Sequence, residues 1–428
     1  MTQKILRGRV LSFTACPKNA DDHAAYTYVE DGALCLENGQ IVAMGAFDEM
    51  PQDVPVTDHR PHLLMAGFID THNHFVQMQV IGSYGAQLLD WLENYTFPAE
   101  TKFNDPDHSA RIATQYFDEM LRHGTTTPVA YCSVHKTSAE AYFNAAAARN
   151  IRAIGGKVLM DRNAPDGLLD TPQTGYDDSV DLIGKWHGTG RALYAISPRF
   201  AITSTPAQLE AAQALVAENP DCYMQTHLSE NRDEIAATMS LYPEHLDYLG
   251  IYEHYGLLGP RSLLGHAIHL SDREISVMAE TGSVAVFCPT SNLFIGSGLF
   301  DHARIQNADI PVAIATDIGG GTSYSMLRTL DEAYKVCQLK GQNLSPLYAF
   351  YLITLGNAKA LGLNDKIGTL DAGTEADIVV LNANATQAMR LRMETVETLS
   401  EELFVLQTLG DDRAIVETYV AGRSVKPV

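Results

Sequence analysis

The sequence lacks several features that mark other classes of protein. None of its six cysteines forms a Cys-x-x-Cys pair, so neither a disulfide framework nor a thiolate zinc site is expected. No stretch approaches the ~20 apolar residues of a membrane span, and Lys4, Arg7 and Arg9 interrupt the apolar pattern that a signal peptide needs near its start. Basic residues are scarce, with 30 Lys and Arg against 52 Asp and Glu. The net charge of -22 repels nucleic acids and anionic membranes, so we expect the protein to bind neither. Without a signal-peptide pattern or a membrane span, we expect it in the cytoplasm.

Strand-like and helix-like segments alternate through the middle of the chain. Its 428 residues, 46% of them apolar, suffice for one barrel of about 250 residues and a second layer. Apolar residues recur at helical spacing in Ala110–His123, Pro206–Glu218 and Ser325–Lys340. Ser271 and Glu274 fit a capping box, which predicts that a helix begins there.

Eight segments between these helices are dense in aliphatic residues, as expected for parallel strands that are buried on both faces. They are Leu64–His72, Thr126–Cys132, Arg152–Met160, Ala192–Pro198, Cys222–His227, Ser262–His269, Ser283–Cys288 and Pro311–Asp317. Repeated strand–helix units favour a parallel sheet, and eight of them favour an α/β fold with a closed (β/α)8 TIM barrel. A doubly wound open sheet is the alternative.

Both ends of the chain are rich in β-forming residues. Asn38-Gly39 separates two apolar runs and is typical of a tight hairpin turn, and Ala376–Leu381 and Ala414–Val420 predict further strands. Neither end is large enough to bury its own face, so we expect the two to pair in one small β-sandwich domain. The expected division is a composite small domain from 1–65 and 366–428 and a barrel from 66–365.

Polar residues end several of the predicted strands, at the face where such barrels collect their catalytic groups. His72 and His74 point the same way because side chains alternate along a strand, although a packed or surface histidine pair is the alternative. Asp317 follows an otherwise apolar run, where a carboxylate needs a cation or hydrogen-bond donors nearby. With His227, these residues supply three nitrogens and one oxygen. That set suits zinc or iron(II), with one position open for water.

Glu230 follows His227 by three residues, where the chain leaves the strand. A carboxylate there can take a proton from a metal-activated water and later return it to substrate. The alternative is a glutamate that opens the next helix near its positive end. His266, on the sixth strand, can hold the attacking water and stabilise its charge, whereas His269 is expected to be structural.

Seven stretches across the whole barrel resemble the guanine deaminases of the amidohydrolase superfamily. The His-x-His and Thr-Asp pieces are common to the superfamily, whereas Leu-Asp-Trp-Leu and Pro-Arg-Phe-Ala are much narrower. The stretches are Ala66–His74 with Gln77, Leu89–Pro98, Lys157–Asn163, Pro198–Ala201, Gln225–Asn231, Cys288–Leu293 and Thr316–Gly321.

This resemblance implies a role for each of the residues singled out above. It implies that His72, His74, His227 and Asp317 bind zinc, that Glu230 is the proton shuttle, that His266 and Asp317 place the water, and that Gln77, Arg199 and Phe200 hold a purine. It also implies a homodimer.

The three predicted purine-binding residues also have suitable chemistry. Gln77 offers both a donor and an acceptor, Arg199 offers a rigid fork of donors for O6 and N7 of guanine, and Phe200 offers an apolar face. Taken singly, these residues would be a surface amide, a surface cation and a core aromatic side chain.

Two further features bear on metal number and base preference. Related barrels with two metals bridge them through a modified lysine on strand four, and Ala192–Pro198 has none, so one metal per chain is favoured. Lys157 lies on strand three and is expected to support the site or to line the pocket as a cation. Phe287 stands where family members often have histidine, and Phe75, Val76 and Met78 also depart from the family.

The sequence therefore predicts an enzyme of purine catabolism. Zinc-activated water attacks C2 of guanine, Glu230 carries the proton to N3, and the products are xanthine and ammonia. Because of the departures, an aminohydrolase acting on a pterin, a triazine or another purine remains an alternative. A catalytically dead barrel that serves as a scaffold is a third possibility.

Overall fold

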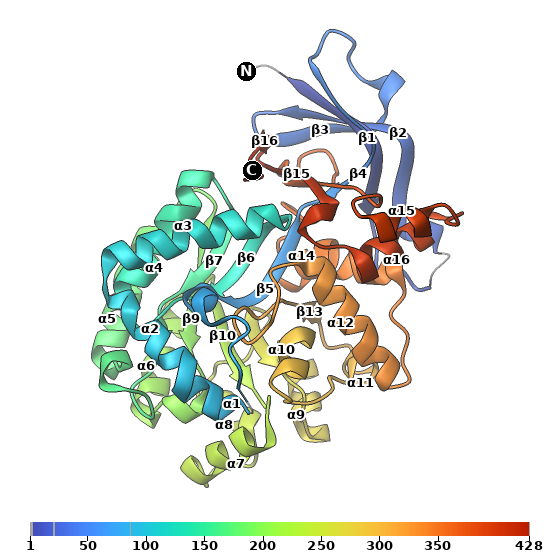
Figure 1. Cartoon of the computed structure of the whole chain (residues 1–428). Helices are drawn as coiled ribbons and strands as arrows, with labels where there is room; N and C mark the ends of the chain where they lie inside the picture. The colour runs from blue at the N-terminus through green and yellow to red at the C-terminus, as the bar shows by residue number, and fades with distance from the viewer. Residues whose placement is uncertain (1–2, 20–21, 86, 428) are drawn as a thin grey trace.

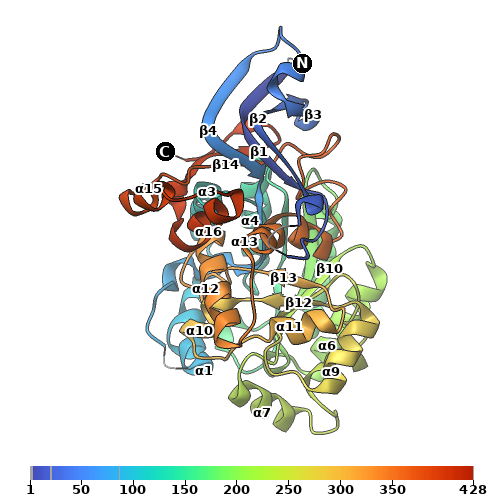
Figure 2. The same cartoon turned by 90° about the vertical axis from the view of Figure 1, so that its right-hand side faces the viewer.

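The computed structural model describes residues 3–19, 22–85 and 87–427. It consists of a barrel ringed by helices and a separate sheet on one side of the barrel (Figure 1). Both ends of the chain lie on the side that carries this sheet, away from α7 (Arg232–Leu241) (Figure 1, Figure 2). Within the described residues, no helix is long and apolar enough to cross a bilayer.

The barrel is a ring of parallel strands in the order β5-β6-β7-β9-β10-β11-β12-β13. They are β5 Phe68–His74, β6 Thr125–Tyr131, β7 Ala153–Gly156, β9 Ala192–Pro198, β10 Tyr223–Leu228, β11 Ser262–His266, β12 Val284–Phe287 and β13 Val312–Ile314, and the short β8 Val158–Leu159 pairs with β9. The backbone N–H of Asp317 donates to the carbonyl of His72 (2.9 Å) and thereby joins the last strand to the first. The predicted TIM barrel is confirmed.

The first predicted strand, Leu64–His72, is in fact parts of two strands. β4 (Val56–Ala66) belongs to the separate sheet, and β5 begins the barrel. Gly67 lies between them, and its N–H donates to the carbonyl of Asp377 (2.9 Å). A Cβ at Gly67 would overlap the side chain of Thr126, so the close approach of the two parts requires glycine.

Two other barrel strands end earlier than Ser262–His269 and Pro311–Asp317 predict. His266 and Asp317 have left-handed φ angles of 69° and 51°. A residue in this conformation cannot continue an extended strand. β11 therefore ends at His266, β13 ends before Asp317, and both side chains lie at the barrel mouth.

Helices cover the outside of the barrel (Figure 1). Pro206–Glu218 has the predicted bounds, and the capping box at Ser271 is present. The helix expected at Ala110–His123 begins at Pro106, because the Asp105 side chain caps the N–H groups of the first turn. The remaining helices are α1 Leu88–Trp91, α2 Phe97–Glu100, α3 Pro106–Arg122, α4 Lys136–Arg149, α5 Pro172–Trp186, α6 Pro206–Glu218, α8 Tyr248–His254, α9 Asp272–Thr281, α10 Pro289–Phe294, α11 His302–Asn307, α12 Met326–Leu339, α13 Pro346–Tyr351, α14 Asn357–Ala360, α15 Gln387–Met393 and α16 Leu399–Leu409.

The separate sheet is continuous, in the order β16-β15-β14-β4-β1-β2-β3. Its strands are β1 Lys4–Phe13, β2 Tyr26–Glu37, β3 Gln40–Ala46, β4 Val56–Ala66, β14 Ile378–Leu381, β15 Ile415–Val420 and β16 Arg423–Ser424. The predicted hairpin is confirmed, with φ of 54° at Asn38 and 84° at Gly39. β4 pairs with β14 in an antiparallel register that sets Ala66 opposite Ile378, so the two ends of the chain do pair. The division at residues 66 and 366 stays a prediction.

Candidate functional site

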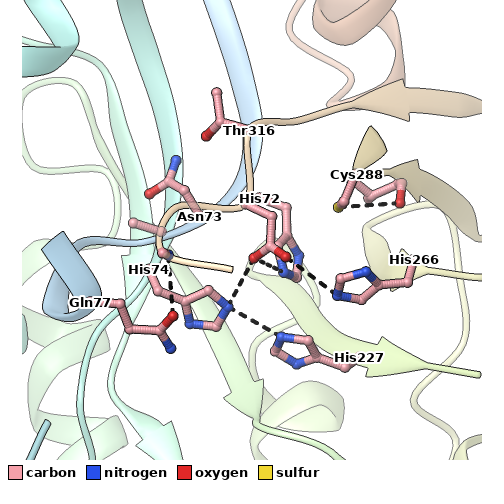
Figure 3. Close-up of polar contacts among 12 residues, drawn as sticks. His72, Asn73, His74, Gln77, His227, His266, Cys288 and Thr316 are labelled. Atoms are coloured by element: carbon pink, nitrogen blue, oxygen red, sulfur yellow. Dashed lines mark hydrogen bonds and ion pairs between the residues drawn. The ribbon is translucent and has the colours of Figure 1, made fainter. Parts of the chain in front are cut away.

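The mouth of the barrel gathers the polar residues predicted from the sequence. His72 and His74 end β5, His227 lies on β10 and His266 ends β11. Figure 3 shows the imidazole rings of His72 and His74 from β5 converging with those of His227 from β10 and His266 from β11. All four rings are buried, and so are the carboxylates of Asp317 and Glu230.

His72, His74, His227 and Asp317, here called the ligand set, place their donor atoms around one point. The Nε2 atoms of His74 and His227 face each other at 3.2 Å. The Nε2 atoms of His72 and His74 each lie 3.5 Å from Oδ1 of Asp317. Three nitrogens and one oxygen at such spacing match the donors that zinc takes in proteins.

The histidines of the ligand set have donor atoms that the rest of the protein does not satisfy. Neither ring nitrogen of His72 nor Nδ1 of His74 has a hydrogen-bond partner within the described residues, although all three atoms are buried. Such groups cost about 1–3 kcal/mol each if nothing binds them. His227 differs, because its Nδ1 lies 2.7 Å from the carbonyl of Arg199, which turns Nε2 toward the site. The residues present therefore fit a divalent cation.

Burial favours the form of these side chains that binds a cation. It lowers the pKa of His74 and His227 well below the ordinary value, and the neighbouring histidines lower it further. Burial opposes ionisation of Asp317, but the contacts with His72 and the other histidines outweigh it and lower its pKa to about 2. Neutral imidazoles and an ionised carboxylate are the states that coordinate metals.

Glu230 and His266 lie beside the ligand set. Nε2 of His266 lies 3.4 Å from Oε2 of Glu230 and 3.7 Å from Oδ2 of Asp317. Burial lowers the pKa of His266, but the two carboxylates outweigh it, and the net shift is upward. Burial raises the pKa of Glu230. A carboxylate and an imidazole, each with a raised pKa, therefore lie side by side next to the ligand set.

Neighbouring side chains hold this pair in place. The Ser297 hydroxyl donates to Oε1 of Glu230 (2.7 Å), and Nδ1 of His266 lies 2.8 Å from Oδ1 of Asn292. Glu234 accepts the backbone N–H of Glu230 (2.8 Å). His269, expected to be structural, lies with Nε2 at 2.8 Å from the carbonyl of Ser297.

A cavity opens onto Glu230 and onto His74, His227 and Asp317 of the ligand set. The three predicted purine-binding residues, Gln77, Arg199 and Phe200, all line it, and we call them the base trio. Gln77 comes from the 3-10 segment Phe75–Val80, and the other two follow β9. The other lining residues are Leu88, Trp91, Leu92, His266, Ser291, Ile295 and Gly320.

Glu100 is a buried carboxylate behind two residues that line this cavity, and the sequence analysis missed it. It accepts hydrogen bonds from Nε2 of Gln77 (2.8 Å) and from Nη1 of Arg199 (2.7 and 3.0 Å). The resembling stretch that contains this segment stops at Pro98. A lone glutamate after the apolar Phe97–Ala99 was the available signal, because Asp317 was found by the same kind of pattern.

Lys157 and Phe287 do not line the cavity. The Lys157 ammonium group donates to Asp170 (2.6 Å), so its expected place as a pocket cation is wrong. Phe287 stacks on Phe300 with ring centroids 4.6 Å apart, on the outer face of its strand. The departure from the family at Phe287 therefore leaves the cavity wall unchanged.

Comparison with known proteins agrees with this site. The Amidohydrolase family matches residues 63–425. A guanine deaminase of Escherichia coli (strain K12) is 46% identical over 429 residues, which cover 99% of this chain and 98% of that protein. The solved structure of E. coli guanine deaminase matches with a TM-score of 0.96 and 45% identity over 99% of both chains. A C. acetobutylicum guanine deaminase with bound guanine in its active site matches with a TM-score of 0.89 and 30% identity, over 99% of this chain and 100% of that one. This chain therefore belongs to the amidohydrolase family, in which its full-length relatives include guanine deaminases.

Proposed function

We propose that this protein hydrolyses guanine to xanthine and ammonia with the help of one zinc ion per chain. The observation that carries the proposal is a single cavity lined by three members of the ligand set (His74, His227 and Asp317), by Glu230 and by the base trio. The guanine deaminases that match the whole chain support the same substrate.

The ligand set would hold the cation. Bound there, a divalent cation would supply Lewis acidity and lower the pKa of a water molecule to roughly 7. Three imidazoles and one carboxylate suit zinc and also iron(II), so the identity of the ion is decided by metal analysis.

Glu230 transfers the protons of the reaction, and His266 assists it. Glu230 removes a proton from the attacking water and delivers it to N3 of guanine as the new C–O bond forms at C2. Glu230 then transfers the proton of the new C2 hydroxyl to the exocyclic nitrogen, the C2–N bond breaks, and ammonia leaves as the carbonyl of xanthine forms. His266 donates a hydrogen bond to the attacking oxygen. The raised pKa of Glu230 suits a group that must both accept and release a proton.

The base trio would orient the purine. Arg199 donates to O6 and N7, Phe200 covers one face of the ring, and Gln77 offers one amide hydrogen and one lone pair beyond those it already uses. A ring held in this way presents C2 to the attacking water.

The test is ammonia release from guanine by protein with a measured metal content. We expect turnover that disappears after chelation and returns with zinc. Turnover of a pterin, a triazine or another purine in preference to guanine would show that guanine is not the main substrate. Metal-loaded protein that is inactive on the whole panel would favour a catalytically dead scaffold.

We include in the proposal a homodimer, which the family resemblance supports, and a location in the cytoplasm. Light scattering coupled to size-exclusion chromatography should give twice the mass of one chain, 46.8 kDa. Cell fractionation should recover the protein with the cytosol.

A further inference from the structure

Glu100 joins two members of the base trio. It ends α2, and its side chain is fully buried. Its carboxylate accepts from Gln77 and Arg199, which reach it from other parts of the chain. Three segments far apart in sequence therefore meet at one carboxylate beside the cavity.

The burial of Glu100 makes this contact more than an incidental ion pair. An ionised carboxylate is tolerated out of water only when a cation and hydrogen bonds offset its desolvation. Arg199 supplies the cation, and Gln77 supplies a further donor. Both oxygens of Glu100 accept from Nη1 of Arg199, so Nε and Nη2 keep their donors for a ligand.

Glu100 also decides which way the Gln77 amide faces. A carboxylate accepts hydrogen bonds and donates none, so the group of Gln77 that points at Glu100 must be the NH2. On its other side, Oε1 of Gln77 accepts the backbone N–H of Gly319 (3.2 Å). A flipped amide would set oxygen against oxygen and nitrogen against nitrogen. The donor and acceptor that Gln77 presents to the cavity are therefore fixed.

We infer that Glu100 is a positioning residue that sets the preference for a 6-oxo purine. It holds Arg199 and Gln77 as one unit whose net charge is zero, so the donors of Arg199 are aimed at a neutral carbonyl oxygen. This inference rests on the proposed function, because it assumes that Arg199 contacts O6.

Two ligands without a 2-amino group allow recognition of O6 to be measured without catalysis. Hypoxanthine has the 6-oxo group and lacks the 2-amino group, and purine lacks both. Calorimetric titration of the metal-loaded protein should give a dissociation constant about 10- to 100-fold lower for hypoxanthine than for purine. This is the range expected for one hydrogen bond to a charged group. In Glu100→Gln the two constants should differ less than about threefold. Glu93→Gln, on the preceding segment and exposed, is the matched control and should keep the wild-type ratio.

A double-mutant cycle shows whether Glu100 acts through Arg199. Arg199→Met should also abolish the preference, and adding Glu100→Gln to it should change the ratio less than about twofold. If Glu100 had only a structural role, its loss would weaken the binding of both rings equally. An unchanged ratio of the two dissociation constants in Glu100→Gln would therefore overturn the inference. Where Glu100→Gln fails to fold, Glu100→Asp, which keeps the charge but withdraws it by one methylene, should lower the ratio. An unchanged ratio in that variant would have the same meaning.

The two proposals fail in different ways. Wild-type protein that prefers hypoxanthine through Glu100 but releases no ammonia from guanine would refute the proposed reaction alone. Wild-type protein that deaminates guanine while Glu100→Gln retains the preference would refute the role of Glu100 alone.

Discussion

The two ends of the barrel differ in how their buried polar side chains are paired. At the mouth, His266 and Asp317 have strained left-handed backbones, and neither ring nitrogen of buried His72 has a hydrogen-bond partner among the residues that the structure describes. At the opposite end, Arg152 and Arg191 precede two barrel strands, and each is paired with a carboxylate of the segment that leads into β14. The mouth thus holds ring nitrogens that a ligand could bind, whereas the arginines at the other end are already paired with carboxylates.

The satisfied end also attaches the separate sheet to the barrel. Nε of Arg152 and Nε of Arg191 donate to Oε2 of Glu375 (3.0 and 3.1 Å), and Nη1 of Arg191 donates to Asp377 (3.2 Å). Asp377 further accepts the backbone N–H of Ala421 (2.8 Å). Substitutions at the mouth should therefore change activity, and substitutions at the other end should change stability.

The largest expected effect is at the mouth. Glu230→Gln keeps the shape of the side chain but removes the proton shuttle, so guanine turnover should fall about 10²- to 10⁴-fold. The melting temperature should stay within about 2 °C of wild type, and zinc should remain bound. Ammonia release and a thermal scan check this, with exposed Glu210→Gln as the control. If Glu230→Gln turned over guanine within tenfold of wild type, Glu230 would not be the proton shuttle.

At the opposite end, Arg191→Ala should mainly cost stability. It leaves Glu375 and Asp377 short of a buried cation, and the free energy of unfolding should fall by about 3 kcal/mol. Below the unfolding transition, kcat/KM for guanine should stay near the wild-type value. Urea unfolding measures the first quantity, and Arg413→Ala, whose arginine is exposed, should leave it unchanged. A large loss of activity with unchanged stability would break the comparison.

The same cluster predicts how stability depends on pH. Burial raises the pKa of Glu375, but hydrogen bonds and charge from Arg152 and Arg191 outweigh it, so the net pKa lies below its ordinary value of 4.5. A carboxyl with a depressed folded-state pKa adds stability above pH 4.5, and this stability is lost as the pH falls through the folded-state value. Urea midpoints should therefore drop on acidification, and the part due to Glu375 should shrink in Arg191→Ala. An equal slope in both proteins would contradict this account.

The smallest expected effect concerns Phe287. Phe287→Leu loses the stacked contact with Phe300 and should cost about 1 kcal/mol of stability. Its preference among purines should not change, because the side chain faces away from the cavity. A shifted preference would show that the outer face of β12 communicates with the base.

Much of the site could be predicted because its residues stand at strand ends. Alternation places His72 and His74 on one face, and the parallel strands bring His227 and Asp317 to the same mouth whatever the loops do. The ends of the strands at His266 and Asp317 were missed, since left-handed backbones at non-glycine residues leave little trace in a sequence. Glu100 was missed for another reason. Its role depends on tertiary pairing with Gln77 and Arg199, which local patterns do not record.

The central claim is that the ligand set holds one divalent cation on which guanine turnover depends. Elemental analysis of the purified protein by mass spectrometry, with guanine turnover measured on the same samples, tests it most directly. The account predicts about one zinc or iron per chain in the wild-type protein, and loss of both metal and turnover in His74→Ala. Full guanine turnover by metal-free protein, or an ion retained at full occupancy in His74→Ala, would contradict it.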